Sequence, residues 1–188
     1  MKRKMNFCSN CGSDRLQFKV PLGDNRPRWV CQNCGTIHYS NPNIVAGCLP
    51  IWGDQVLLCK RSIEPRLGYW NVPGGYLENG ERVEEGASRE VWEEALAKVV
   101  DLEIHTIYSI PHINQVYMHF LGRMETLEFG VGEESEEVRL FREDEIPWKE
   151  IAFTSSVFTL KRYYADLKAG QRKVHIGHLD LEKFRNRK

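Results

Sequence analysis

The chain of 188 residues is 41% hydrophobic and has 26 basic and 26 acidic side chains, so its formal net charge is zero. This length can form one real core with a small accessory module. The neutral balance is unlike that of a general nucleic-acid or membrane-surface binder. No apolar run approaches the length of a membrane span, and the charged start has no apolar region behind it. We therefore expect a cytoplasmic protein whose basic ends are solubilising tails rather than RNA-binding arms.

Four of the six cysteines form two closely spaced pairs. Cys8 and Cys11 make the first Cys-x2-Cys motif, and Cys31 and Cys34 make the second. A glycine follows each pair and permits the positive φ that a tight metal-binding turn favours. The spacing predicts a structural zinc site, because four thiolates complete a tetrahedral shell and leave no position open for catalysis. Paired spacing disfavours the alternative of scattered buried thiols.

The segment between these pairs predicts a zinc ribbon over residues 1–40. Two short strands, Leu16–Val20 and Arg28–Val30, are joined by a polar turn. A unit this small has almost no core, so metal binding would supply much of its folding free energy. The sequence leaves open whether the ribbon also contacts nucleic acid or a partner. Residues 41–43 (Asn-Pro-Asn) indicate the boundary with a larger domain, residues 41–188.

A β-hairpin is predicted at the start of that domain. Residues 44–52 and 55–61 are apolar runs separated by Gly53-Asp54. This turn would place Cys48 and Cys59 opposite one another. We expect two ordinary buried thiols, because a reducing cytosol disfavours a cross-strand disulfide.

The remaining elements predict helices around a mixed sheet. Residues 67–75 read as a loop and short strand, and an apolar residue at every fourth position predicts a helix over residues 83–99. A second helix is expected from Ser155, a good N-cap, to Gly170, a good C-terminal stop. The expected later strands are 103–110, 115–124, 138–142 and an edge strand at 173–177. This order of elements favours an α/β architecture.

The first helix gathers carboxylates on one face. Glu90, Glu93 and Glu94 are related by i,i+3 and i,i+4, so their side chains reach toward one point. They would repel one another without a cation, and their oxygens suit Mg²⁺ or Mn²⁺. The opposite charges of Glu81 and Arg89 could lock the preceding loop to the helix. A bare match of this kind is usually a solvated helix face, but the glycine loop and the fixed offsets favour a metal site.

The same segment resembles the Nudix box, G-x5-E-x7-R-E-U-x-E-E-x-G-U, where U is a large apolar residue. The matching residues are Gly75, Glu81, Arg89, Glu90, Val91, Glu93 and Glu94. One departure is Leu96 at the late glycine position, followed by Ala97. Because that glycine helps to end the helix, the helix is expected to run on or to bend differently here. The resemblance implies a Nudix-type α/β/α sandwich around a mixed sheet over residues 41–188.

The likeness extends to most of the chain. A four-cysteine ribbon before a Nudix domain resembles the NADH pyrophosphatases, and further segments are closer to plant chloroplast FAD diphosphatases and their bacterial relatives. These segments are Asn41-Pro42, residues 56–61, residues 139–141 and residues 145–147. The NADH-specific array S-Q-P-W-P-F-P-x-S is replaced by residues 109–115, which argues against a strict NADH enzyme. The resemblance also implies a homodimer.

The resemblance implies metal-dependent hydrolysis of a pyrophosphate in FAD, ADP-ribose or an NADH-like dinucleotide, releasing AMP and the other phosphate half. Glu90, Glu93 and Glu94 would hold Mg²⁺ or Mn²⁺, while Glu81 and Arg89 would be structural. The general base often lies on a later loop, where Glu134 and Glu137 are candidates; the alternative is a solvated acidic loop. Removal of a nicotinamide cap from RNA, or a catalytically silent nucleotide sensor or RNA-binding regulator, would use the same scaffold.

Substrate-binding candidates come from the residues before the box. Arg61 and Arg66 could hold phosphate, or form surface salt bridges. Tyr69, Trp70 and Phe153 could stack on adenine or isoalloxazine, although such aromatics are more often core. We expect the histidines to form no ligand cluster: His112 lies where specificity is expected, and His175 and His178 read as polar strand residues. We expect no histidine catalyst.

Overall fold

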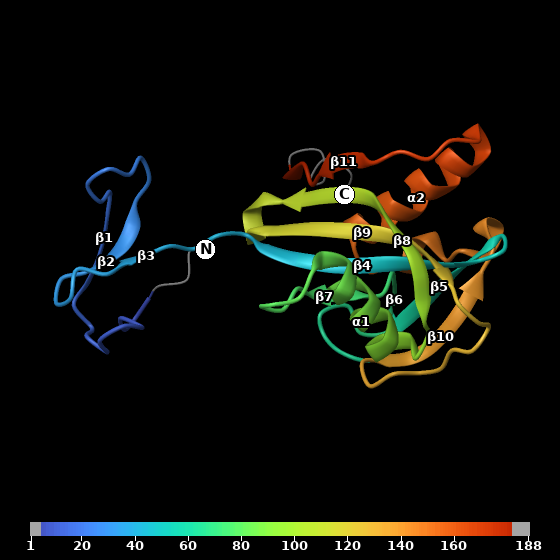
Figure 1. Cartoon of the computed structure of the whole chain (residues 1–188), viewed down its shortest axis with the longest axis horizontal. Helices are drawn as coiled ribbons and strands as arrows, with labels where there is room; N and C mark the ends of the chain where they lie inside the picture. The colour runs from blue at the N-terminus through green and yellow to red at the C-terminus, as the bar shows by residue number, and fades with distance from the viewer. Residues whose placement is uncertain (1–4, 182–188) are drawn as a thin grey trace. The chain divides into compact units, whose positions relative to one another are not determined.

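The computed structural model describes residues 5–181. The chain forms two compact units, one ending at Asn41 and the other beginning at Pro42 (Figure 1). The smaller unit is a three-stranded antiparallel sheet in the order β1-β2-β3. Its strands are β1 (Leu16–Lys19), β2 (Arg28–Cys31) and β3 (Ile37–His38). The two expected strands are present, and β3 is a third that the sequence analysis did not identify.

The larger unit is built on a mixed sheet in the order β10-β5-β4-β9-β8-β11, with β6 paired to β5 and β7 paired to β4. The β4–β9 and β8–β11 pairs are parallel and the others are antiparallel. The strands are β4 (Asn43–Trp52), β5 (Gln55–Arg61), β6 (Trp70–Asn71), β7 (Gly74–Tyr76), β8 (Val99–Ile110), β9 (Gln115–Met124), β10 (Ser135–Phe141) and β11 (His175–His178). Short 3-10 turns cover Pro111–Ile113, Glu143–Glu145 and Trp148–Glu150.

Alternation along β4 and β5 directs side chains to two separate cores, one on each face of the sheet. Cys48 and Leu57 pack with helix α1 (Val83–Ala95), whereas Leu49 and Leu58 pack with helix α2 (Thr154–Ala169). The two helices therefore cover opposite faces of the sheet (Figure 1). This is the α/β/α sandwich that the sequence predicted.

Helix α1 is shorter than predicted. Its N-terminus is fixed by Glu85, whose side chain accepts a hydrogen bond from the backbone N–H of Arg82 at 2.8 Å. The helix ends at Ala95 rather than at residue 99, because Leu96 adopts φ 50° and its N–H donates to the Trp92 carbonyl. A left-handed residue at this position is the usual way to stop a helix. Leu96 thus ends the helix as a glycine would, and residue 99 belongs to β8.

Helix α2 also starts differently from the prediction. Phe153 occupies the N-cap position, and Ser155 lies buried in the first turn with its hydroxyl unpartnered in the described residues. The expected stop at Gly170 is confirmed: its φ is 60° and its N–H donates to the carbonyls of Asp166 and Leu167.

The predicted hairpin opens soon after its turn. Strands β4 and β5 pair at only two positions, and β6 and β7 then lie between them. Cys59 is therefore opposite Asn71, and the Cys48 N–H donates to the Pro73 carbonyl at 3.0 Å. The expectation that the two cysteines face one another was wrong, although both are buried free thiols. The inserted segment brings the residues before Gly75 against α1.

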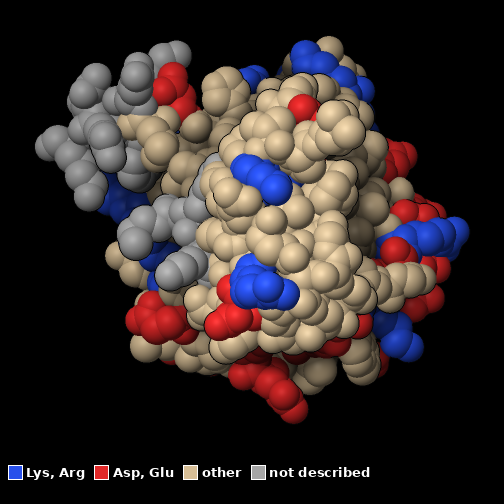
Figure 2. All heavy atoms as spheres, turned by 90° about the vertical axis from the view of Figure 1, so that its left-hand side faces the viewer, with Lys and Arg blue, Asp and Glu red and all other residues tan. Residues whose placement is uncertain are grey.

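The surface carries charges of both signs. On the face drawn in Figure 2, lysine and arginine side chains stand apart among acidic and uncharged residues, and its described residues form no broad basic patch. Within residues 5–181, no helix is long and apolar enough to cross a membrane.

Candidate functional site

The four predicted zinc ligands lie together in the smaller unit. Their sulfur atoms are all within 4.8 Å of one another, with Cys8 and Cys34 at 3.7 Å and Cys11 and Cys31 at 3.7 Å. A hydrogen bond from the hydroxyl of Thr36 lowers the pKa of Cys34 to about 5, which favours the thiolate that binds metal. Four sulfur donors in this arrangement fit a closed structural zinc site.

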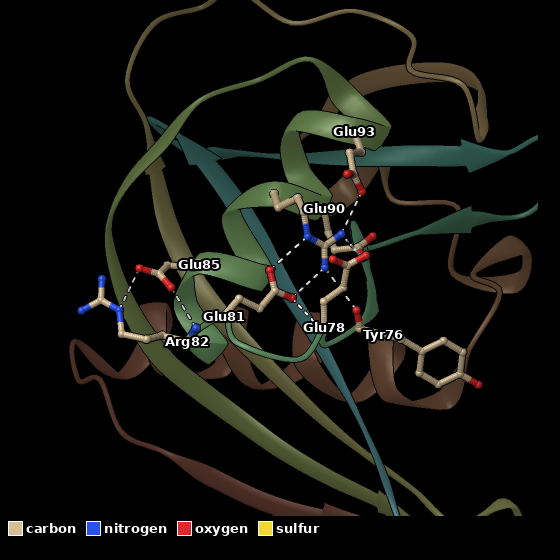
Figure 3. Close-up of polar contacts among 8 residues, drawn as sticks. Tyr76, Glu78, Glu81, Arg82, Glu85, Glu90 and Glu93 are labelled. Atoms are coloured by element: carbon tan, nitrogen blue, oxygen red, sulfur yellow. Dashed lines mark hydrogen bonds and ion pairs between the residues drawn. The ribbon is translucent and has the colours of Figure 1, made fainter. Parts of the chain in front are cut away.

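In the larger unit, Arg89 is the centre of the polar network before and along α1. Its guanidinium forms ion pairs with Glu81 at 2.8 Å, Glu90 at 2.8 Å and Glu93 at 2.9 Å (Figure 3). It also donates to the backbone carbonyl of Tyr76 at 3.1 Å. The loop is thus fixed to the helix as the opposite charges of Glu81 and Arg89 predicted. These hydrogen bonds lower the pKa of Glu81 to about 2, so it remains charged.

The carboxylates that turn toward the sheet are buried. Glu94 is 5% exposed and accepts a hydrogen bond from the Gly74 N–H at 3.3 Å. Burial raises the pKa of Glu94 to about 8 and also raises that of Glu90. Nearby negative charges on Glu134 add to both effects. With its pKa near 8, Glu94 needs a neighbouring cation to be fully ionised at neutral pH.

Gly75 provides the space for one of these carboxylates. A Cβ atom at this position would lie 2.5 Å from Oε1 of Glu90, so any side chain here would displace that carboxylate. The glycine of the box therefore leaves the Glu90 carboxylate in its place beside the backbone. Its φ is negative or extended, so turn geometry is not the reason.

The loop after β9 closes the C-terminal end of α1. The N–H groups of Gly130 and Gly132 donate to the carbonyls of Ala95 and Glu94 at 2.7 and 3.1 Å. A Cβ at Gly132 would clash with the backbone of Glu93. This contact brings Glu134 to the carboxylate face. A cavity of about 830 Å³ results, lined by Gly75, Tyr76, Glu78, Arg89, Glu90, Trp92, Glu93, Glu94, Leu96, Val131, Gly132, Glu133 and Glu134.

The donor set of this cavity fits a hard divalent cation. All of its ligating candidates are carboxylate oxygens, and the cavity is open enough to admit a phosphate-bearing ligand. The carboxylate oxygens of the three α1 glutamates are not all within 4.8 Å of one another, a spacing that within residues 5–181 is reached by the four cysteines and by His105, Asp166 and His175. Glu90 and Glu93 are instead bound to Arg89, so they would have to turn from it to hold an ion.

Four of the predicted substrate-binding residues contact one another in pairs and do not line this cavity. The Arg61 guanidinium stacks over the Phe153 ring at 5.2 Å, and Arg66 lies over Tyr69 at 5.4 Å. Arg61 is close enough to Glu94 for its charge to oppose the rise in pKa of that residue. Neither pair is among the described residues that line the cavity.

Two other predictions do not agree with the structure. Trp70 is 5% exposed and packs edge-on against Phe141 in the core, so its ring is not available to stack on a base. Glu137 is exposed on β10, opposite Lys60, and does not contribute to the cavity wall among the described residues. Successive side chains of β10 point to opposite faces of the sheet. Glu134 precedes this strand, and its side chain lines the cavity.

The sequence analysis missed the aromatic residues of the cavity. Tyr76 and Trp92 line it and are 56% and 49% exposed. The Tyr76 hydroxyl accepts a hydrogen bond from Gln115 at 2.6 Å. Their signal in the sequence was weak but present: Tyr76 follows the box glycine Gly75 and Trp92 precedes Glu93, positions where a loop or helix surface would normally be polar.

Two family models match the chain. The model described as Nudix N-terminal covers residues 6–40, and the NUDIX domain model covers residues 41–161. A NUDIX hydrolase from Nitrosomonas europaea of known structure is 48% identical, with a TM-score of 0.88 over 93% of this chain and 99% of that one. The matched boundaries agree with the two compact units of the fold.

Similarity to more distant proteins is partial. The NAD-capped RNA hydrolase NudC of Salmonella heidelberg is 27% identical over 77% of this chain, which spans 54% of that relative's length. An ADP-ribose pyrophosphatase from Streptococcus suis is 20% identical, with a TM-score of 0.58 over 74% of this chain and 100% of that one. This last likeness is one of fold alone.

Proposed function

Because this chain belongs to the Nudix hydrolase family, we propose that it hydrolyses the pyrophosphate bond of a dinucleotide or another nucleoside diphosphate derivative. The observation that carries this proposal is the meeting of the α1 carboxylates with the loop of Glu134 around one cavity. The preferred substrates are FAD, ADP-ribose or an NADH-like compound, and the products are AMP and the other phosphate half. Residues 1–40 form the structural ribbon and residues 41–188 the hydrolase domain.

Glu90, Glu93 and Glu94 are proposed to hold Mg²⁺ or Mn²⁺. Such an ion, when bound, neutralises charge on the pyrophosphate oxygens and activates water. Arg89 orients Glu90 and Glu93 and is itself fixed by Glu81. In a cavity this rich in carboxylates, an anionic substrate would be repelled without the cation, which explains why the proposal requires a metal.

Glu134 is proposed as the general base. It lies beside Glu90 and Glu94, and the Ser62 N–H holds its backbone carbonyl at 3.0 Å. A base must be within hydrogen-bond reach of the attacking water. Glu134 lines the cavity and Glu137 does not, which supports Glu134. Arg61, Arg66, Tyr69 and Phe153 are proposed to contact the substrate outside the cavity. Tyr76 and Trp92 are proposed to take the stacking role expected of Trp70.

The decisive experiment measures AMP release from FAD, ADP-ribose and NADH with Mg²⁺, with Mn²⁺ and with neither. We expect metal-dependent release from at least one of them. Glu94→Gln should abolish turnover while the protein stays folded, because the amide keeps the shape but removes the charge. Glu84→Gln is the matched control, since Glu84 is a half-buried residue of the same helix whose ion pair, within residues 5–181, is with Arg82. Near-normal turnover by Glu94→Gln would overturn the metal assignment.

A second comparison separates the two candidate bases. Glu134→Gln should lower kcat by about 10²- to 10⁴-fold, the usual contribution of a general base. Glu137→Gln should have the smaller effect. The reverse order would assign the base to β10.

The relative named NAD-capped RNA hydrolase supports a second candidate function, removal of a nicotinamide cap from RNA. Both reactions cleave a pyrophosphate, so the test is a comparison of kcat/KM for capped RNA and free NADH. A much higher value for the RNA would establish decapping as the main activity. Binding of a dinucleotide without cleavage would instead identify a silent sensor.

We also propose that the protein is cytoplasmic and forms a homodimer. Light scattering after gel filtration would test the homodimer.

A further inference from the structure

A second cluster of ligand-type side chains lies in the larger unit, away from the carboxylate cavity. His105 on β8, Asp166 on α2 and His175 on β11 come from three elements that are far apart in the sequence. One ligand atom from each lies within 4.8 Å of the other two. All three side chains are buried, with 2%, 5% and 9% of their surface exposed. His175 is a strand residue as predicted, but the expectation that the histidines form no ligand cluster was wrong.

The hydrogen bonding of the cluster is incomplete. Nε2 of His175 lies 2.9 Å from Oδ2 of Asp166, and the backbone N–H of Lys173 donates to the same oxygen at 3.4 Å. The rings of His105 and His175 meet edge to face with centroids 5.3 Å apart. Nε2 of His105 is fully buried and has no hydrogen-bond partner among the described residues. An unpaired buried polar group is costly, so a ligand at this point would relieve it.

The chemistry and spacing of the three groups suit a divalent metal of the zinc type. Two imidazoles and a carboxylate are typical zinc ligands, with bonds of about 2.0–2.2 Å. Ligand atoms of a tetrahedral shell are then about 3.3 Å apart. The three ligand atoms of the cluster lie within 4.8 Å of one another, so side-chain rotation would have to bring them to this spacing around an ion. A cavity of about 210 Å³, lined in part by Asp166, Gly170 and Arg172, gives solvent access to the carboxylate. The charge of Arg172 is directed to Glu103 at 3.2 Å.

We propose that His105, Asp166 and His175 form a second zinc-type site, separate from the ribbon and from the α1 glutamates, with water as the fourth ligand. The site would fasten β11 to α2 and β8. Strand β11 is an edge strand that pairs only with β8 among the described strands, through four residue pairs. A metal bond between β11 and the helix would therefore stabilise the edge of the sheet where few other contacts hold it.

Metal content of the full chain tests the proposal directly. The protein is stripped with a chelator under reducing conditions, dialysed against Zn²⁺ with excess Mg²⁺ to fill the carboxylate cavity, and analysed by mass spectrometry of the metal. Wild type should hold one more zinc per chain than His105→Asn and His175→Asn. His178→Asn is the matched control, because His178 is an exposed histidine of the same strand. Equal zinc in all four proteins would overturn the proposal.

A second measurement covers the case in which the histidine variants do not fold. A Cys8→Ser/Cys11→Ser protein removes half of the ribbon ligands and leaves the cluster intact. X-ray absorption of its remaining zinc should show nitrogen and oxygen donors with imidazole scattering. Loss of all zinc from this protein, or zinc without imidazole, would show that the cluster is only a hydrogen-bonded group. Zinc should also raise the melting temperature of this protein, with no substrate present.

Discussion

Gly75 and Glu90 are so close that a Cβ atom on the glycine would lie 2.5 Å from Oε1 of the glutamate. The atoms in conflict belong to the end of a flexible side chain, so Gly75→Ala should displace the carboxylate without disturbing the backbone. We predict a fall in kcat/KM of about 100-fold, the effect expected when a reacting group is misplaced by about 1 Å. Hydrolysis assays at saturating metal measure this loss. An unchanged rate would contradict the role of Glu90.

Gly74→Ala is the matched comparison for this variant. A Cβ on Gly74 would lie 2.8 Å from Cα of Gly47 and 2.9 Å from the Ala46 carbonyl oxygen, both backbone atoms that cannot turn aside. This change should lower the free energy of unfolding by roughly 1–3 kcal/mol, as overpacking usually does. Chemical denaturation should therefore separate the two variants: the first loses activity, and the second loses stability.

The left-handed conformation of Leu96 leads to a prediction about stability. A Cβ at φ 50° costs about 1 kcal/mol, which glycine avoids. Leu96→Gly should therefore be more stable than Leu96→Ala by about 1 kcal/mol, since both variants lose the leucine side chain beyond Cβ. Urea denaturation of the two proteins measures the difference. Equal stability would show that the helix end relaxes out of the left-handed region.

Removal of the ribbon zinc should affect stability more than chemistry. Cys8 is buried and one of four sulfur ligands, so Cys8→Ser should release zinc and destabilise the smaller unit. The rate of hydrolysis should change little, because the proposed catalytic residues all lie in the larger unit. Zinc content, melting and turnover are measured on the same sample. Loss of turnover with unchanged melting would contradict a structural zinc.

His119 should make stability depend on pH. Burial lowers its pKa from 6.5 to about 4, and its Nδ1 lies 3.0 Å from the hydroxyl of Thr159. Above pH 6.5 the ring is neutral in both the folded and the unfolded chain, and its contribution is fully present. As the pH falls from 6.5 to about 4, only the unfolded chain binds the proton, so up to about 3 kcal/mol of stability is lost.

His119→Gln should reduce the loss of stability across this pH window, because the glutamine cannot titrate. His112→Gln is the control, because His112 is an exposed histidine in the 3-10 turn that precedes strand β9, which carries His119. The measurement is the free energy of unfolding at several pH values between 4 and 7. Parallel curves for wild type and His119→Gln would show that other groups cause the acid sensitivity.

The proposed metal ligands could be predicted because they are local in sequence. Glu90, Glu93 and Glu94 share a helix face through their spacing alone, and the salt bridge from Glu81 to Arg89 spans one loop and two turns. The cysteine pairs are likewise set by two short motifs. The environment of residues outside the box was harder to predict. Trp70 is buried because it packs against Phe141, which is 71 positions away in the chain, and strand order brings the two together.

The amino-acid sequence by itself determined the cysteine ligands, the carboxylate face and the motif at the boundary of the two units, because each follows from spacing within a few residues; the layered fold followed from the resemblance of the box. Only the tertiary structure decided the end of α1 at Leu96, because the left-handed conformation of a leucine is not signalled by its residue type. The approach of Glu134 to the carboxylates and the meeting of His105, Asp166 and His175 depend on contacts between segments that are distant along the chain. Such contacts are fixed by strand order and by packing between layers, neither of which a local pattern records.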